Sequence, residues 1–263
     1  MSVLTLLTDF GTQDGFVGVM KGVIWGICPT VQIADISHQI QPQNLIQGAI
    51  TLSRVAPFFG DGTIHVAVVD PGVGTHRRAI AAQLGTQLYV APDNGLLTLL
   101  IQDAEEKQLP LKFVELNKRE YWLNQVTSTF HGRDIFAPVG AHLAASVPLK
   151  NLGKPIDDPI LLPFSKPEKT DSGWNAHISL IDTFGNLRTD LHTDRIKGEA
   201  KVNILGQEID SISKSYGHHE VGDLVALKDS EGYLEIAVVN GNAEKRVDAK
   251  VGDLVEVVIS PSS

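Results

Sequence analysis

The segment IHVAVVDPGVG, residues 64–74, decides the fold of the first half of the chain. Its first six residues are almost unbroken apolar, which is typical of a strand that is covered on both faces. Around this segment, strand-like runs alternate with stretches in which apolar residues have helical spacing: 3–8, 16–27, 31–36, 44–55, 80–84, 88–90 and 96–101. This alternation predicts an α/β domain with a mainly parallel central sheet.

The sequence pattern changes over residues 150–172, where four prolines interrupt a stretch with few periodic features. Such a stretch is typical of a linker between domains. Short strand patterns separated by Gly- and Asp-containing turns follow it: 177–181, 200–204, 224–227, 233–239 and 254–259. They predict a small all-β, barrel-like domain. We therefore expect an α/β domain over residues 1–165 and a barrel-like domain over residues 172–263.

Composition narrows the classes of function. The 263 residues carry a net charge of −9, which argues against a nucleic-acid partner, because such binding needs basic patches. Cys28 is the only cysteine, so an intrachain disulfide and a Cys-rich metal site are both excluded. No apolar run approaches the roughly 20 residues of a membrane span. The N-terminus has the pattern of a first strand, not of a signal peptide, so we expect a cytoplasmic protein.

Two acidic residues occupy the position where open parallel sheets bind ligands, beyond the carboxyl ends of strands. Asp9 follows the first strand, and Asp70 ends the strand that begins at Ile64. Both could be simple turn formers or helix caps. However, the Pro-Gly turn after Asp70 allows close approach of backbone to a ligand, and Asp14 adds a second acid to the Asp9 loop.

A third cluster, TFHGRD at residues 129–134, precedes an apolar helical stretch. Its His131 could be a helix cap or a group for acid–base chemistry. Arg77 and Arg78 should face opposite ways on a strand, so that at most one points back to the site. A metal cage could in principle be built from five residues, but no metal-binding spacing supports it: Asp9, Asp70, Asp93, His131 and Asp134. We therefore expect no metal.

Five stretches resemble one known family: LTDFG at 7–11, VDPGVGTHRR at 69–78, APDNGLL at 91–97, TFHGRD at 129–134 and IDTFGN at 181–186. They resemble the S-adenosyl-L-methionine (SAM) hydroxide adenosyltransferases, which are SAM hydrolases related to the bacterial fluorinase and chlorinase. The likeness runs in order from residue 3 to about residue 258. It implies an α/β domain, a β-barrel domain and a homotrimer, with the substrate between the N-terminal domain of one subunit and the C-terminal domain of its neighbour.

The resemblance also implies an activity and a set of site residues. The activity is cleavage of SAM to adenosine and methionine by in-line attack of water at the ribose C5′, without a cofactor. Asp70, Arg77 and His131 match the residues that position the water. Substrate contacts are implied for eight further residues. Asp9 matches the acid on the ribose hydroxyls, and Asp182 matches the group on the methionine ammonium. Ser230 matches a contact to the methionine carboxylate, and the adenine side is matched by Phe184, Asn186 and Asn240. Phe130 and Gly132 flank His131 in the same motif.

Departures from the halogenating relatives bear on the activity. Those enzymes have an uncharged, often aromatic residue where Asp70 stands, and the fluorinase has a serine at Gly132. An anionic Asp70 should repel a halide but suits a water that loses a proton, which favours hydrolysis. Glu231 stands where the fluorinase has an arginine, and Arg188 replaces a tryptophan, so recognition of the methionine end stays open. The alternatives are a SAM-dependent halogenase and a non-catalytic SAM or adenosine sensor.

Overall fold

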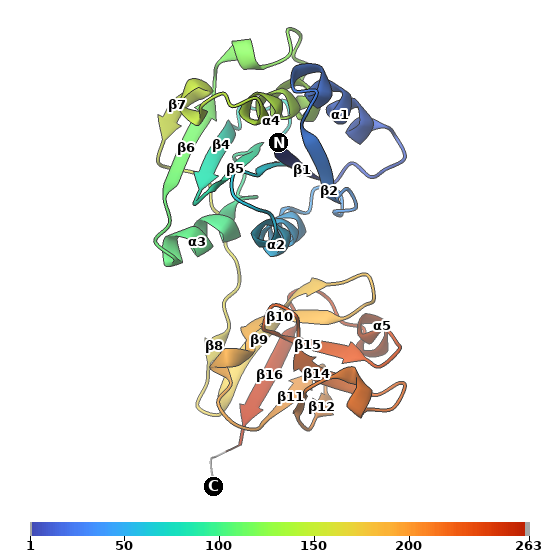
Figure 1. Ribbon diagram of the computed structural model, residues 1–263. Coiled ribbons are helices and arrows are strands. Elements are labelled where there is room, and N and C mark those ends of the chain that lie inside the picture. The colour runs from blue at the N-terminus through green and yellow to red at the C-terminus, as the bar shows by residue number, and fades with distance from the viewer. Residues whose placement is uncertain (1, 261–263) are drawn as a thin grey trace. The chain divides into compact units, whose positions relative to one another are not determined.

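The computed structural model describes residues 2–260. The chain forms two compact units, Met1–Leu162 and Pro163–Ser263. Each is described here by itself (Figure 1).

The first unit is built on a seven-stranded sheet of order β2-β1-β3-β5-β4-β6-β7. Its strands are β1 (Val3–Thr8), β2 (Gln32–Ser37), β3 (Ile64–Val68), β4 (Ala79–Leu84), β5 (Gln87–Pro92), β6 (Leu111–Leu116) and β7 (Gly153–Ile156). The pairings from β2 through β1 and β3 to β5 are parallel. All five residues of β3 are buried, as its apolar sequence predicts.

The other half of this sheet is antiparallel, so the prediction of a mainly parallel sheet is wrong for it. Only two residues, Gly85 and Thr86, separate β4 from β5, and so short a link can join only antiparallel strands. Gly85 adopts a positive φ of 60°, which suits such a turn. The sequence carried this hairpin signal, in two strand patterns separated by a very short link.

Four α-helices cover the sheet: α1 (Phe16–Ile27), α2 (Leu45–Val55), α3 (Thr98–Glu106) and α4 (Ala137–Ala144). α1 packs with α4 on one face, and α2 packs with α3 on the other (Figure 1). On the first of these faces Leu6 and Val66 join Met20 and Phe136 in one buried core. Single 3-10 turns occur at η1 (Ala56–Phe58), η2 (Arg119–Tyr121) and η4 (Leu149–Asn151), and η3 (Gly132–Phe136) is a π-helical turn that leads into α4.

The second unit is nearly all β and nearly barrel-shaped. Its strands are β8 (Glu168–Lys169), β9 (Gly173–Ile181), β10 (Leu187–His192), β11 (Ala200–Ile204), β12 (Gln207–Ile209), β13 (Ile212–Ser213), β14 (Leu224–Lys228), β15 (Tyr233–Val238) and β16 (Leu254–Ile259). The described part of this unit also has 3-10 turns at η5 (Thr193–Arg195) and η6 (Tyr216–His218) and a short helix, α5 (Ala243–Val247). The sheet order is β12-β11-β16-β9-β10-β15-β14-β13. β12 also contacts β14, which brings the two ends of the sheet together.

The first part of the proline-rich stretch packs on the first unit. The N–H of Ile160 donates to Asp93 and the N–H of Leu162 donates to Thr98, at 2.8 and 2.9 Å. Among residues 2–260, no helix is long and apolar enough to cross a membrane.

Candidate active site

The centre of the site is an ion pair between Asp70 and Arg77. Asp70 stands at the carboxyl end of the β3 segment, and Arg77 lies just before β4 after a tight turn. Arg77 Nε donates to both carboxylate oxygens at 2.9 and 3.1 Å, and Arg77 Nη2 donates to Oδ2 as well. The two side chains are 5% and 10% exposed, so water screens this pair poorly and the attraction is strong.

A glycine brings a distant loop against the turn that follows Asp70. Gly74 has a φ of +77°, and a Cβ at this position would lie 2.2 Å from the carbonyl oxygen of Ser128. No other residue type could therefore occupy the position without moving the loop. This close contact places the segment that carries His131 beside the ion pair.

His131 completes the arrangement. Its Nδ1 lies 2.8 Å from Arg77 Nη2. Because a guanidinium can only donate, Nδ1 must be the unprotonated acceptor. Burial lowers the pKa of His131 below its ordinary value, and the positive charge of Arg77 adds to this effect. Asp70, Asp134 and the Thr127 backbone act in the opposite direction without reversing it. His131 is therefore neutral at pH 7.

The neighbouring Arg78 points elsewhere, which confirms that only one of the two arginines faces the site. Its Nε donates to Asp93 at 2.8 Å and its Nη1 donates to Asp158 at 2.7 Å. Asp134 is likewise held by Arg133 and by the Thr127 backbone. Within residues 2–260, no group of three or more His, Cys, Asp or Glu side chains could hold a metal ion.

Asp9 lies on the wall of the same cavity as Asp70. It follows β1, and its Oδ2 accepts the N–H of Gln43 at 2.7 Å. Its Oδ1 has no hydrogen-bond partner in the part of the chain that the structure describes. The next turn is fixed by the N–H of Gly11, which donates to the carbonyl of His38 at 2.8 Å. One carboxylate oxygen of Asp9 is thus left to accept hydrogen bonds from a ligand.

The cavity has a volume of about 660 Å³ and combines carboxylates with aromatic rings. Phe10, Phe16 and Phe130 pack edge to face, with ring centroids 5.3 to 6.1 Å apart. Gly132 lies against this group, since a Cβ there would come within 3.2 Å of Phe10 and 3.3 Å of Phe130. Carboxylates beside aromatic faces suit a ligand that is both hydroxylated and cationic. The role of Phe10 and Phe16 was missed in the sequence, although Phe10 belongs to the LTDFG stretch.

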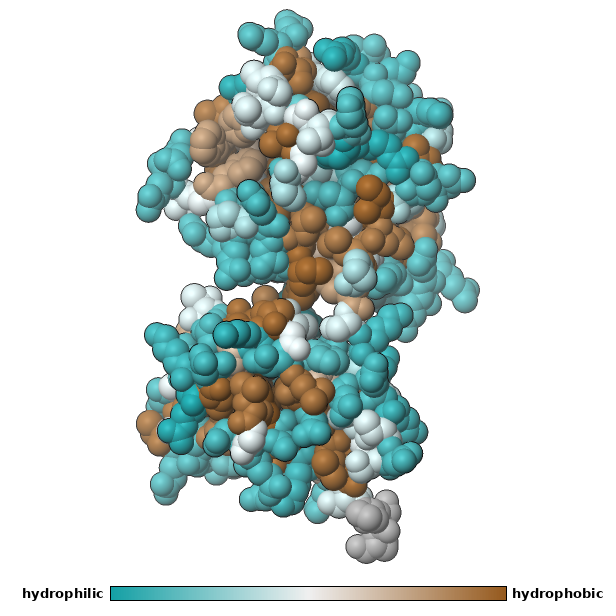
Figure 2. Space-filling model, turned by 180° about the vertical axis from the view of Figure 1, so that it is seen from behind, coloured by the Kyte–Doolittle hydropathy of each residue, from teal (hydrophilic) through white to brown (hydrophobic). Residues whose placement is uncertain are grey.

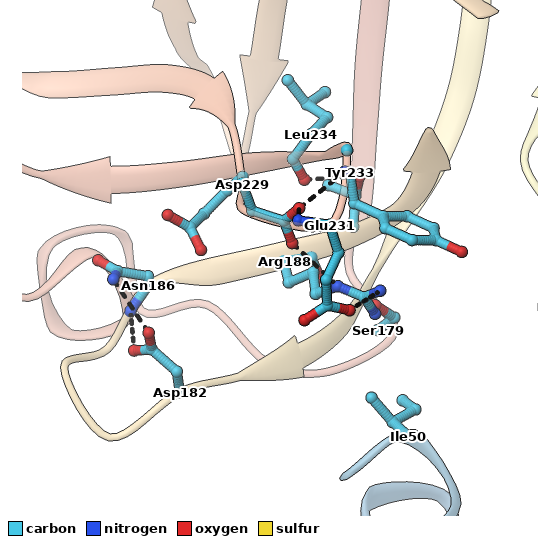
Figure 3. A network of polar contacts seen from close by, with 12 residues as sticks. Ile50, Ser179, Asp182, Asn186, Arg188, Asp229, Glu231, Tyr233 and Leu234 are labelled. Carbon is cyan, nitrogen blue, oxygen red and sulfur yellow. Dashed lines mark hydrogen bonds and ion pairs between the residues drawn. The ribbon is translucent and has the colours of Figure 1, made fainter. Parts of the chain in front are cut away.

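In the second unit, Asp182 and Asn186 form a closed turn between β9 and β10 (Figure 3). Asp182 Oδ1 accepts the N–H groups of Phe184 and Asn186, both at 2.9 Å, and Oδ2 accepts the Asn186 side-chain amide at 3.0 Å. Phe184 projects from this turn and is 75% exposed. Within this unit Asp182 therefore orders the turn that presents Phe184.

A second arginine cluster lies nearby in the same unit (Figure 3). Arg188 Nε donates to Asp229 at 3.1 Å and Nη2 donates to Glu231 at 3.2 Å. Its guanidinium carbon lies 3.8 Å from the centroid of the Tyr233 ring. Asp229 and Tyr233 were missed in the sequence, although the Asp-Ser-Glu-Gly turn was noticeable. Ser230 lies exposed in this turn, and Asn240 lies exposed just after β15.

Comparison with known proteins identifies the family. The model of the SAM hydroxide adenosyltransferase N-terminal domain matches residues 4–153, and that of the C-terminal domain matches residues 176–256. The chain belongs to the SAM hydroxide adenosyltransferase family. A family relative from Salinispora tropica, named (R)-S-adenosyl-L-methionine hydrolase, is 34% identical over 97% of each chain. A fluorinase from Actinopolyspora mzabensis is more distant, with 27% identity over 89% of this chain and 90% of that one.

Among solved structures, the crystal structure of an uncharacterized conserved protein from Thermotoga maritima is similar to this chain. The TM-score is 0.89 at 35% identity, and the match covers 97% of this chain and 99% of that one. The family resemblance that the sequence motifs indicated is thus confirmed, whereas the roles of the individual site residues stay predictions.

Proposed function

We propose that this protein hydrolyses S-adenosyl-L-methionine to adenosine and L-methionine. The observation that carries the proposal is the hydrogen-bonded set Asp70–Arg77–His131, whose members Asp70 and His131 line the same cavity as Asp9. The relatives named as hydrolases carry the (R) descriptor in their names, and we take the (R) sulfonium epimer as the substrate of this chain too.

The reaction is a displacement at the ribose C5′. The oxygen of water forms a bond to C5′ while the C5′–S bond breaks, and sulfur takes both electrons of that bond. Methionine leaves as a neutral thioether, so no general acid is needed. The proton of the attacking water passes to Asp70 and then to solvent. We expect no metal and no other cofactor.

The geometry divides the work among the three residues. Arg77 donates to both oxygens of Asp70, while each oxygen keeps lone-pair capacity for a water. The Nδ1 of His131 is occupied by Arg77, so Asp70 is the better proton acceptor of the two. A positioned base of this kind contributes about 10²–10⁴-fold to a rate. A halide would meet the negative charge of Asp70, which favours water as the nucleophile.

The remaining groups of the cavity hold the substrate. Asp9 accepts hydrogen bonds from the ribose hydroxyls, and alignment of bound reactants supplies several kcal/mol of barrier reduction. Phe130 and Gly132 form part of the wall, where aromatic faces attract the sulfonium cation.

We assign the amino-acid and adenine ends of SAM to the second unit on the strength of the family resemblance. Asp182 binds the ammonium, Ser230 binds the carboxylate, and Phe184, Asn186 and the backbone near Asn240 bind the adenine. The active form is a homotrimer in which these residues come from a neighbouring subunit.

Exposed apolar side chains of α1 support an oligomer, since Val19 and Trp25 are 45% and 47% exposed. Brown apolar patches also lie among hydrophilic side chains on the face drawn in Figure 2. The protein acts in the cytoplasm, without a nucleic-acid or membrane partner. The net charge of −9 and the single cysteine agree with this proposal.

Incubation of the purified protein with each SAM epimer in the presence of a chelator tests the proposal. We expect adenosine and methionine, separated by chromatography, to form in equal amounts from the (R) epimer. Absence of turnover, or turnover that requires added metal, would contradict it. Parallel reactions with chloride and fluoride detect halogenated adenosine, the product of a halogenase. Bound but intact SAM is the result expected of a sensor.

A further inference from the structure

Asp134 lies behind the active-site loop, and its side chain is completely buried. Its Oδ2 accepts both the N–H of Thr127 at 2.8 Å and the Thr127 hydroxyl at 2.7 Å, and its Oδ1 accepts Arg133 Nε at 2.6 Å. Burial by itself would raise the pKa of Asp134, but the hydrogen bonds from Arg133 and Thr127 outweigh burial and lower it. The carboxylate is therefore ionised, and the proposed reaction does not use it.

The contacts of Asp134 fix both ends of the loop that carries Phe130 and His131. Its backbone N–H donates to the carbonyl of Phe130 at 3.0 Å, and its carbonyl accepts the N–H of Leu123 at 2.9 Å. The Asp134 side chain also binds Thr127. The next residue, Ser128, has its carbonyl against Gly74 of the turn that follows Asp70. The same carboxylate thus connects the loop with the turn on which Asp70 stands.

We infer that Asp134 is a positioning residue for the hydrolysis, holding the Thr127–His131 loop so that His131 stays against Arg77. Asp134 does not line the cavity, whereas Thr127 and His131 do, so its effect on the substrate passes through them. This inference rests on the proposed function, because its kinetic test measures turnover of SAM. A structural readout is also available, because the charge of Asp134 acts on His131.

Three charged side chains act on the His131 imidazole. The positive charge of Arg77 lowers the pKa of His131, and the negative charges of Asp70 and Asp134 raise it. Loss of the Asp134 charge should therefore lower the pKa of His131 further. Since a neutral His131 is needed to accept from Arg77, the acidic limb of the pH–rate profile should move to lower pH.

The experiment compares four variants with the wild type. Asp134→Asn removes the charge at nearly constant volume, Thr127→Val removes the hydroxyl but leaves the charge, and Thr127→Ser restores the hydroxyl. Asp103→Asn is the matched control, because Asp103 lies on α3 and is paired only with the exposed Lys107 among the described residues. Turnover of SAM gives kcat, KM and the pH profile, and NMR titration of the His131 imidazole gives its pKa without turnover.

For Asp134→Asn we expect kcat to fall by about 10- to 100-fold with KM little changed, because a misplaced loop costs alignment more than affinity. The acidic limb and the NMR pKa of His131 should both move down. Thr127→Val should lower kcat without moving the limb, and Thr127→Ser and Asp103→Asn should resemble the wild type.

The inference is overturned if Asp134→Asn keeps kcat within about twofold of the wild type, or if the His131 pKa is unmoved. If Asp134→Asn does not fold, the two Thr127 variants decide. Equal kcat for Thr127→Val and Thr127→Ser overturns the inference, and a lower kcat for Thr127→Val alone supports it. An inactive wild type would instead overturn the proposed function, and the NMR titration would still decide the role of Asp134.

Discussion

Two arginines of this chain, Arg77 in the first unit and Arg188 in the second, are buried against carboxylates in similar ways. They differ in what surrounds the pair. Arg77 pairs with one aspartate that lines a cavity, and gives its remaining contact to a neutral imidazole. Arg188 is bound by two carboxylates and covered by the Tyr233 ring.

One partner of Arg188, Asp229, also stabilises the local backbone. Asp229 Oδ1 accepts the backbone N–H groups of Glu231 and Tyr233, both at 2.8 Å, so this carboxylate closes the turn between β14 and β15. A buried ion pair alone therefore does not indicate catalysis. What distinguishes Asp70 is that its carboxylate lines an open cavity that a second carboxylate, Asp9, also lines. We therefore expect the two networks to respond differently to mutation, in turnover at one and in stability at the other.

The largest effect is expected from Asp70→Asn. Because this change removes the proton acceptor at nearly constant volume, kcat should fall by about 10²–10⁴-fold while SAM binding changes little. Steady-state kinetics and calorimetric titration with SAM measure the two quantities. Equal losses of kcat and affinity would make Asp70 a binding residue instead.

A loss of stability is expected from Arg188→Met. This change leaves Asp229 buried without its cation, its side chain being only 5% exposed, and breaking a buried pair from one side costs about 3 kcal/mol or more. Urea unfolding followed by circular dichroism measures the change. Arg195→Met is the control, because among residues 2–260 the exposed Arg195 has only the Trp174 ring beside it, a contact worth about 1 kcal/mol or less. Unchanged stability in Arg188→Met would mean that the cluster is not structural.

The pH dependence tests the state of His131. Its pKa is lowered from an ordinary value of 6.5 by burial and by Arg77, so the neutral form persists to below that pH. Protonation of Nδ1 would place its N–H against the N–H of Arg77 Nη2, so that two donors would face each other. We expect kcat/KM to be level above pH 6.5 and to fall only below it, as far as His131 determines the profile. A midpoint on the acidic side above 6.5 would contradict the neutral, acceptor form of His131.

The smallest effect is expected from Gly132→Ser. The added Cβ would lie 3.2–3.3 Å from the rings of Phe10 and Phe130, so these rings must shift by a few tenths of an ångström. We expect KM for SAM to rise a few-fold, with a small change in kcat and no halogenated product in chloride or fluoride. A halogenated product would show that the choice of nucleophile lies at Gly132 and not at Asp70.

Local patterns in the sequence predicted much of this site. Asp9 and Asp70 were found because each follows an apolar strand. The opposite directions of Arg77 and Arg78 were expected from the alternation of side chains along a strand, and they hold although β4 begins only at Ala79. The direct contact between Arg77 and His131, 54 residues apart, was suggested only by family resemblance. It depends on the approach of Gly74 to Ser128, which no local pattern contains.

Two of the places where the prediction of the fold was incomplete show the reasons. The β4–β5 hairpin was missed because apolar runs were assigned to parallel strands without regard to the length of the link between them. β10 was missed because it buries the polar residues Arg188 and Thr189, so its sequence lacks the apolar pattern of a core strand. The hairpin was a local signal that was overlooked, whereas at β10 tertiary contacts decided the outcome.

In the proposed reaction, water positioned by Asp70 attacks C5′ of the adenosyl group. Turnover of SAM in water enriched in oxygen-18, followed by mass spectrometry of both products, tests it most directly. If water attacks C5′, we expect one labelled oxygen in the 5′-hydroxyl of adenosine and none in methionine. Unlabelled adenosine, or release of 5′-methylthioadenosine with the label in the amino-acid product, would contradict it.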